Sequence, residues 1–458
     1  MLEANRNPKI RTLTYSEIDG FSGFVGNFNV RIRKKARYTT SKCNGCGACF
    51  DVCPAYRPHD FEYGMAQSKA IYKSFAQAVP GVVQIDKQYC IDCGMCAKAC
   101  ELKAVDYDQK DEIIEEKFGI VVLASGFYEW LPPVGTLGFG VYENVITQGR
   151  LERILAPNGP TVGHLIRPSD GKRPTRIAFI QCVGSRDTQT NPHCCTTGCL
   201  LSVKNSKLIK QHYPDTEEYV IFMDLRCTGK MSEEYSMATR EAGVHFIRSN
   251  IGRIIEDEKT KNLVLRFEDT MNPGTLQKLE VDMVVLTTNM VLGEEGTRLA
   301  KLMKLDLSPD SFLKEYHARL DPISTKVPGI FLAGTVQGPK NIAESISHAK
   351  GAASSAARIL QAGKYEIELI RAVVEKPDTC SKCYRCVEAC PYGAISIDDQ
   401  GKINVDVISC KGCGTCNSVC RSQTIQLRYY RDPGYEGQID ALFGAPAAAP
   451  QETKDSSK

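Results

Sequence analysis

Several common signals are missing from this 458-residue sequence. No apolar run approaches the roughly 20 residues that a membrane-spanning helix needs, and the first residues lack the apolar core of a signal peptide. The 57 basic and 54 acidic residues leave a net charge of only +3, which offers no footprint for nucleic acid. We therefore expect a cytoplasmic protein with no membrane span and no nucleic-acid partner.

Signals of self-contained catalysis are absent as well. No G-x-G-x-x-G turn follows a strand pattern, so the chain lacks the loop that holds a dinucleotide pyrophosphate at a helix N-terminus. No Ser/His/Asp or Cys/His pair has the context of an activated nucleophile, which leaves acyl transfer without support. His348 reads as a packed or surface residue. We assign no catalytic residue.

Cysteine, in contrast, is abundant, with 21 residues. Sixteen of them form four copies of the spacing C-x2-C-x2-C-x3-C, at 43–53, 90–100, 380–390 and 410–420. This run wraps a cubane iron–sulfur cluster, because soft thiolates suit iron and sulfide. Gly45, Gly47 and Gly94 let backbone amides turn towards the cluster sulfurs. Four repeats of one spacing leave structural zinc, disulfides and core cysteines as poor alternatives.

The four motifs pair into two ferredoxin-like modules. In such pairs three thiolates close a loop round one cluster, and the fourth cysteine ligates the cluster of the other motif. We therefore predict four [4Fe-4S] clusters with crossed ligand sets: Cys43, Cys46, Cys49 and Cys100; Cys90, Cys93, Cys96 and Cys53; Cys380, Cys383, Cys386 and Cys420; Cys410, Cys413, Cys416 and Cys390.

The middle of the chain alternates strand and helix patterns, which predicts an α/β fold. A buried strand is expected over 118–127 and another over 283–289. Between them we predict strands at 176–181, 219–224 and 243–247 and a helix over 200–212. This alternation indicates a parallel sheet with helices on both faces. Elsewhere, a strand is expected over 24–33 and a helix between the first two cysteine motifs, ended by Pro80.

Two strand ends are candidates for a nucleotide cofactor. The strand over 118–127 ends at Gly126, and a later strand, 329–335, runs into a loop and a helix from about Asn341. Small residues there allow close backbone approach, and the positive helix N-terminus suits a reduced anionic flavin. Pro339 is expected in the first turn of that helix. Lys340 contacts the flavin or is a solvated loop lysine. The candidate cofactor residues are Gly126, Gly334, Thr335, Gln337, Gly338 and Lys340.

At this level of detail the sequence resembles the heterodisulfide reductase A-subunit family of iron–sulfur flavoproteins, from about residue 24 to 430. The resemblance lies in the order of both cysteine modules and in four runs: 26–38, 77–80, 180–187 with its Gln-Cys-Val-Gly-Ser-Arg, and 331–340. It implies a thioredoxin-reductase-like core with two dinucleotide-binding domains, one inserted and one C-terminal ferredoxin domain, and bound FAD. Such proteins relay electrons between a donor module and a reductase partner, in several complexes with electron bifurcation.

The sequence departs from the family pattern in four respects. The first Rossmann unit is not found, so we expect a partner chain to supply an N-terminal FAD-binding half. The family also implies a fifth [4Fe-4S] cluster on Cys182, Cys194, Cys195 and Cys199, but Gly198 stands where cysteine is usual. Cys195 or Cys227 would have to complete that set, and a group of reduced thiols is the alternative. Asn289 replaces a usual glycine, and Thr335 replaces an aspartate common in flavoproteins.

The expected domain organisation follows from these patterns. The predicted parts are an N-terminal segment and lead strand (1–40), an inserted ferredoxin-like domain (41–110), a partial FAD domain (111–170 and 286–365), an NAD-domain-like segment (171–285), a C-terminal ferredoxin-like domain (366–432) and a disordered tail (433–458).

We predict an electron-transfer component of a multi-protein, anaerobic oxidoreductase complex. Two alternatives remain: a flavin-free cluster scaffold that conducts between partners, and a stand-alone NADH-using or disulfide-reducing enzyme. The strand over 176–181 runs into Cys182 rather than a glycine-rich phosphate turn, which disfavours NAD binding. Redox sensing by the Cys194-Cys195 pair is a weaker possibility.

Overall fold

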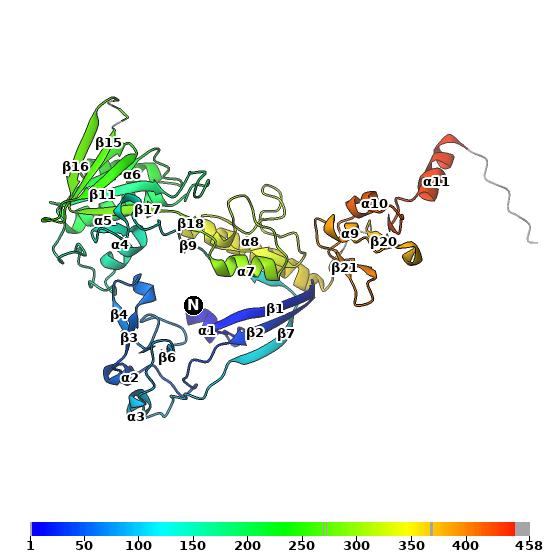
Figure 1. Cartoon of the computed structure of the whole chain (residues 1–458), viewed down its shortest axis with the longest axis horizontal. Helices are drawn as coiled ribbons and strands as arrows, with labels where there is room; N and C mark the ends of the chain where they lie inside the picture. The colour runs from blue at the N-terminus through cyan, green and yellow to red at the C-terminus, as the bar shows by residue number, and fades with distance from the viewer. Residues whose placement is uncertain (1, 269, 272, 367–369, 445–458) are drawn as a thin grey trace, which may run out of the picture.

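A five-stranded parallel sheet is the centre of the largest part of the molecule (Figure 1). The computed structural model describes residues 2–268, 270–271, 273–366 and 370–444. The strand order is β10-β17-β11-β12-β13. After β11 the chain adds β12 and β13 on one side and later places β17 on the other side, as in doubly wound folds. Four strands of this sheet were predicted and are confirmed: β11 (Arg176–Val183), β12 (Glu217–Phe222), β13 (His245–Arg248) and β17 (Met283–Thr288). The edge strand β10 (Val145–Thr147) was not predicted.

The two faces of this sheet are covered differently. Helices α4 (Gln148–Leu155) and α5 (Gly198–His212) pack on one face, with α6 (Ser232–Glu241) against α5. The other face is covered by an antiparallel meander of β14 (Ile251–Glu256), β15 (Leu263–Glu268) and β16 (Leu276–Val281). The prediction of helices on both faces is therefore wrong. Alternate residues of β15 are buried, so the meander presents an apolar face in place of a helix.

Glu218 is an ionisable group buried within this sheet. It is 0% exposed in β12, and neither of its carboxyl oxygens has a hydrogen-bond partner. Burial raises the pKa of Glu218 from 4.5 to about 8, and the Ser206 hydroxyl and Lys210 offset only part of this effect. The folded protein therefore holds this proton more tightly than the unfolded chain does.

Glu218→Gln should change how stability depends on pH. In the wild type the free energy of unfolding should fall as pH rises from about 4.5 to about 8. The reason is that the folded protein keeps the Glu218 proton over this interval while the unfolded chain loses it, so rising pH favours the unfolded chain. Over that pH interval the variant should gain about 5 kcal/mol of stability relative to wild type, because each pKa unit corresponds to about 1.4 kcal/mol. Anaerobic denaturant titrations at several pH values measure this difference. Parallel curves for the two proteins would contradict it.

A second, smaller body is connected to this sheet through two short strands, β9 (Tyr128–Glu129) and β18 (Met290–Val291), which pair with each other. Here β8 (Val121–Leu123) and β19 (Ile330–Leu332) form a two-stranded parallel sheet, with α7 (Glu294–Leu302) and α8 (Ile342–Ala362) beside it (Figure 1). The strand predicted over 118–127 is wrong in extent. It divides at Gly119-Ile120, and Val122 is 43% exposed because only one strand flanks it.

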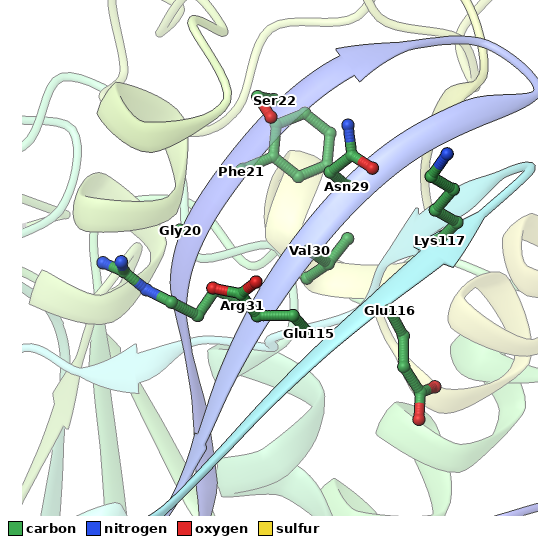
Figure 2. Close-up of a pocket in the computed structure, with 9 residues that line it drawn as sticks. All are labelled: Gly20, Phe21, Ser22, Asn29, Val30, Arg31, Glu115, Glu116 and Lys117. Carbon is green, nitrogen blue, oxygen red and sulfur yellow. The ribbon is translucent and has the colours of Figure 1, made fainter.

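A curved three-stranded antiparallel sheet joins this body to the first cysteine module (Figure 1). Its strands are β1 (Ser16–Phe24), β2 (Asn27–Lys34) and β7 (Glu112–Phe118). The strand expected over 24–33 is confirmed from Asn27 onward as β2, whereas Phe24 ends β1 and a turn lies between them. A groove of about 570 Å³ lies along this sheet. Arg31, Glu116 and Lys117 of its lining point in different directions rather than towards a common centre (Figure 2). We assign no site to it.

The first cysteine module consists of short elements around two helical turns. These are α2 (Ala48–Val52), β3 (Tyr56–Pro58), η1 (Asp60–Glu62), β4 (Gln67–Lys69), β5 (Ile71–Tyr72), β6 (Gln84–Ile85) and α3 (Met95–Ala99). The helix predicted between the first two motifs is wrong. Ile71 and Ile85 pair across β5 and β6 and pack against the cysteines, so tertiary packing decides the local structure.

One buried ion pair fastens this module to the parallel-sheet domain. Arg153 of α4 donates to both carboxylate oxygens of Glu62 at 2.8 and 2.9 Å, and its guanidinium lies 4.6 Å from the ring centroid of Phe61. The two side chains are only 13% and 9% exposed. A bidentate pair of this kind fixes orientation as well as distance.

The C-terminal module repeats the same plan. It contains β20 (Ala372–Val374), η4 (Pro377–Thr379), α9 (Arg385–Glu388), β21 (Ile395–Ile397), β22 (Ile403–Val405), α10 (Thr415–Val419) and β23 (Ile425–Leu427). The disordered tail predicted from 433 is wrong over its first part, which forms α11 (Asp432–Phe443); residues 445–458 lie outside the described residues. Three further short helices are α1 (Leu2–Arg6), η2 (Thr136–Gly138) and η3 (Gly334–Gln337). No helix in the described ranges is long and apolar enough to cross a membrane.

Candidate electron-transfer centres

All four cysteine loops share one backbone conformation. Each motif places two residues in the left-handed region, one immediately before and one immediately after its second cysteine. This conformation turns the chain sharply, so that thiols two residues apart face the same centre. The eight residues have φ between +52° and +91°: Gly45, Gly47, Asp92, Gly94, Lys382, Tyr384, Gly412 and Gly414.

In the first module one cavity gathers a complete crossed set of cysteines. The cavity measures about 250 Å³ and is lined by Cys43, Cys46 and Cys49 from the first motif and by Cys100 from the second. Val83 and Ala104 close its apolar side. Thiol donors around a cavity of this size fit a cubane cluster.

The C-terminal module shows the same exchange of cysteines between motifs twice. Its two cavities are narrower, about 20 and 10 Å³. The first is lined by Cys380, Cys383, Cys386 and Cys420, and the second by Cys410, Cys413, Cys416 and Cys390. In each case the fourth cysteine comes from the partner motif.

The remaining set has no cavity of its own among those described. Cys53, Cys90 and Cys96 belong to one apolar cluster around Ile71 and Ile85, which also contains Cys43 and Cys49 of the first set. Cys93, the other predicted member, is exposed on the same loop. Three crossed sets thus line a cavity each, and the fourth shares a packed core.

Exposure of the cysteines follows their position in the motif. The third cysteine of every motif is buried, and the second is exposed: Cys49, Cys96, Cys386 and Cys416 against Cys46, Cys93, Cys383 and Cys413. Burial raises the pKa of Cys49 to about 12 and that of Cys416 to about 11. Metal binding must displace these protons, so cluster assembly is pH-dependent. The exposed second cysteines bring each centre close to the surface.

Backbone amides point at several of the sulfurs. The amide of Ala104 donates to Cys100 Sγ at 3.3 Å, and that of Ala394 donates to Cys390 Sγ at the same distance. Such bonds stabilise a thiolate and tune the reduction potential of a cluster. In both cases the acceptor is the fourth cysteine of a motif and the donor is the amide four residues further on.

Five further cysteines gather at the carboxyl end of β11. Cys182 is the penultimate residue of β11, Cys194 and Cys195 lie in the following loop, and Cys199 is the second residue of α5. Cys182, Cys194 and Cys199 are close enough to interact electrostatically, and Cys227 interacts with Cys199. A hydrogen bond from the Cys195 thiol lowers the pKa of Cys194 to about 5, helped by the Thr196 amide and by Arg226 and Arg186.

Gly198 has a steric reason to be glycine in this group. A Cβ atom added there would lie 2.5 Å from Thr287 Cγ2 and 2.8 Å from Cys195 Sγ. The sulfur of Cys195 therefore occupies the space that a side chain at 198 would need. His193 points elsewhere, with Nε2 3.0 Å from the Met290 carbonyl oxygen.

The candidate flavin residues lie together at one end of the small parallel sheet. Leu123 and Leu332 are paired across β8 and β19, so the following turns at Gly126 and Gly334 emerge side by side. Gly126 has φ of +79° and open space around it. The chain thus provides two strand ends of the kind that a dinucleotide approaches, on a sheet of only two strands in the described residues.

The predicted loop residues contact one another rather than lying free. Gln337 accepts a hydrogen bond from Lys340 and donates to Glu315 at 3.0 Å, while Thr335 accepts from the Gly338 amide. Burial lowers the pKa of Lys340. Pro339 is not in the first turn of the helix, because α8 begins at Ile342 after a capping box formed by Asn341 and Glu344.

His348 has a role that sequence reasoning did not find. Its Nδ1 accepts a hydrogen bond from the Gly334 amide at 3.0 Å, and its Nε2 lies 3.2 Å from the Pro322 carbonyl oxygen. The ring therefore anchors the Gly334 turn to the neighbouring loop. The spacing between the turn and the helix gave no signal for this contact, because it depends on how α8 packs.

Asn289 also has a structural explanation. It is 1% exposed, and its amide donates to the carbonyl oxygens of Gly184 and His193 at 3.3 and 3.4 Å. The residue ties the end of β17 to the cysteine-bearing loop. A glycine at this position could not make these bonds.

Two cysteine-rich modules carried on an α/β body define an iron–sulfur component of an oxidoreductase. Family models described as the 4Fe-4S dicluster domain match residues 39–104 and 372–421. Two such domains correspond to four [4Fe-4S] clusters.

Curated relatives identify the family. The chain is 46% identical over 452 residues to the iron–sulfur A-subunit of the CoB–CoM heterodisulfide reductase of Methanocaldococcus jannaschii, covering 97% of this chain and 68% of the relative. It is 44% identical to the A-subunit of the H2/formate:CoB–CoM heterodisulfide, ferredoxin reductase of Methanococcus maripaludis, with the same coverage. The chain belongs to the heterodisulfide reductase A-subunit family and is an iron–sulfur electron-transfer protein that acts within a complex.

A relative at lower identity and one solved structure were also found. The A-subunit of the ferredoxin/F420H2-dependent CoB–CoM heterodisulfide reductase of Methanosarcina acetivorans is 39% identical over 87% of this chain and 51% of its own length. Thioredoxin reductase of T. acidophilum aligns with 55% of this chain and 69% of its own at 15% identity, with a TM-score of only 0.36.

Proposed function

We propose that this chain conducts electrons between a donor protein and a disulfide-reducing partner by way of its four crossed cysteine sets. The observation that carries the proposal is the exposure pattern: in each motif the second cysteine is exposed while the third is buried. A [4Fe-4S] cluster takes up and gives out one electron. The chain's own contribution is to hold four such centres near its surface, at both ends of the molecule.

We further propose that a separate FAD-binding chain docks on the small parallel sheet. The exposed apolar residues there support this: Val122 and Phe127 are each 43% exposed, and Ile342 and Ile346 of α8 are 81% and 50% exposed. Such a patch needs a cover. The chain spans 68% of the length of the first two curated relatives, and the family resemblance implies that members of the family use a Rossmann unit to bind FAD.

Within this proposal the chain supplies one half of the flavin cradle. Gly126 and Gly334 let the backbone approach the cofactor, and His348 holds the second turn in place. Lys340 lies at the edge of the same loop, where an ammonium group offsets negative charge. Bound FAD would exchange electrons singly and in pairs. Electron bifurcation is the use of this flavin that the family resemblance implies.

A fifth cluster on Cys182, Cys194, Cys195 and Cys199 belongs to the same proposal. The position of the Cys195 sulfur beside Gly198 supports its replacement of the usual cysteine. Cys227 remains the alternative ligand, since it also interacts with Cys199. None of the 21 cysteines, which all lie in the described residues, forms a disulfide, and this suits a reducing, cytoplasmic and anaerobic setting.

The test is anaerobic co-purification with the protein encoded by the neighbouring reading frame, followed by flavin analysis. Stoichiometric FAD in the pair, and its loss in an Ile342→Glu/Ile346→Glu variant that keeps its iron, is the expected result. FAD absent from every preparation would leave a flavin-free conducting scaffold. FAD bound by the isolated chain, with NADH oxidation in a dye assay, would favour a stand-alone enzyme instead.

A further inference from the structure

Tyr107 lies against a cysteine that the first module is expected to use as a ligand. Its hydroxyl oxygen is 2.9 Å from Cys96 Sγ. As a cluster ligand Cys96 is a thiolate and has no proton to give, so the tyrosine must be the donor. The side chain therefore directs one hydrogen bond at the sulfur of a redox centre.

The position of this hydroxyl is fixed by its surroundings. The ring of Tyr107 packs in the core cluster of the module with Ile71 and Ile85. Lys87 Nζ lies 4.9 Å from the ring centroids of both Tyr107 and Tyr38, and it is paired with Asp92 at 2.7 Å. The Lys87 ammonium group lies over the rings of both Tyr38 and Tyr107, but of these two residues only Tyr107 directs its hydroxyl at a cysteine.

The C-terminal module provides an internal comparison. Tyr107 follows Cys96 by eleven residues, and eleven residues after Cys416 stands Leu427, which lines the cavity of that centre. Leucine has no hydrogen to donate. Thr415 Oγ1 lies 3.4 Å from Cys413 Sγ, and Tyr392 lines the same cavity. Among the described residues no side-chain hydroxyl is hydrogen-bonded to Cys416, so the two related centres differ in the donor to this cysteine.

We propose that Tyr107 raises the reduction potential of the cluster held by Cys90, Cys93, Cys96 and Cys53, and so draws the electron to this half of the module. The inference rests on the proposed ligand set. Adding one electron to a cluster increases the negative charge on its ligand sulfurs, and a hydrogen bond to sulfur stabilises that charge. No proton is transferred: the hydroxyl keeps its hydrogen, and the electron comes from the adjacent cluster or a partner protein.

An anaerobic redox titration of the full chain, followed by electron paramagnetic resonance, tests this proposal. In Tyr107→Phe one reduction step should move to lower potential, so that the ratio of reduced to oxidised cluster falls about three- to tenfold at the wild-type midpoint. Tenfold corresponds to about 59 mV for one electron. Iron per chain should be unchanged. Tyr38→Phe, which removes the other hydroxyl beside Lys87, is the matched control and should shift nothing.

A second variant keeps the proposal testable if Tyr107→Phe loses iron. Leu427→Tyr introduces a hydroxyl at the equivalent place in the C-terminal module and should move a different reduction step to higher potential. Unshifted steps in variants with full iron content would overturn the role of Tyr107 while leaving the clusters in place. Absence of iron and of any reduction step in the wild type would overturn the proposed ligand sets instead.

Discussion

Gly45→Ala should remove one cluster from the protein, a loss of about four of its roughly sixteen irons. Gly45 has φ of +71°, in the left-handed region that residues with a side chain adopt at a cost. A Cβ atom there would also overlap the carbonyl oxygen of Gly81. Because that atom belongs to the backbone, the loop must move, and the sulfurs of Cys43 and Cys46 move with it.

Gly94→Ala is the matched control. Gly94 has nearly the same φ, +72°, but nothing lies within 4 Å of an added Cβ. Only the conformational penalty remains, about 1 kcal/mol, so this variant should keep its full iron content. The measurement is iron and acid-labile sulfide per chain after anaerobic purification. Equal losses in the two variants would show that left-handed conformation alone, and not the contact with Gly81, makes glycine necessary.

Combining substitutions in the C-terminal module should reveal which cysteines share a cluster. Cys420 lines the same cavity as Cys383, although Cys413 is nearer in sequence. Cys420→Ser/Cys383→Ser should therefore lose about four irons, because both residues serve one cluster. Cys420→Ser/Cys413→Ser should lose about eight, because the two residues serve different clusters.

The opposite pattern would contradict crossed ligation. If each motif bound its own cluster, the pair Cys420 and Cys413 would cost about four irons and the pair Cys420 and Cys383 about eight. Cys390→Ser/Cys413→Ser provides an independent control, since these two cysteines line one cavity. Its loss should equal that of Cys420→Ser/Cys383→Ser.

The cysteine modules and the parallel sheet could be predicted from sequence because their signals are local. A motif of eleven residues carries four cysteines and the turns between them, and β11, β12 and β17 each contain a short apolar run. The covering of the sheet could not be predicted in the same way. The segment 251–281 forms a meander whose apolar residues become a packing face only when the strands pair.

The candidate sites show the same division. The spacing of the cysteines predicts which of them form each centre. The contacts of Tyr107 with Cys96 and of His348 with Gly334 span eleven and fourteen residues and depend on tertiary packing, so the sequence alone does not predict them. Between the first two motifs a helix was predicted, but Ile71 pairs in β5 and belongs to the core of the module. Gly198 is explained only by the position of the Cys195 sulfur.

The central claim is that this chain is a multi-cluster conductor, and iron and acid-labile sulfide per chain test it most directly. Anaerobically purified protein should contain about sixteen irons and an equal amount of sulfide, or about twenty of each if the group at Cys182, Cys194, Cys195 and Cys199 also holds a cluster. About eight irons or fewer, or bound zinc without sulfide, would contradict the account.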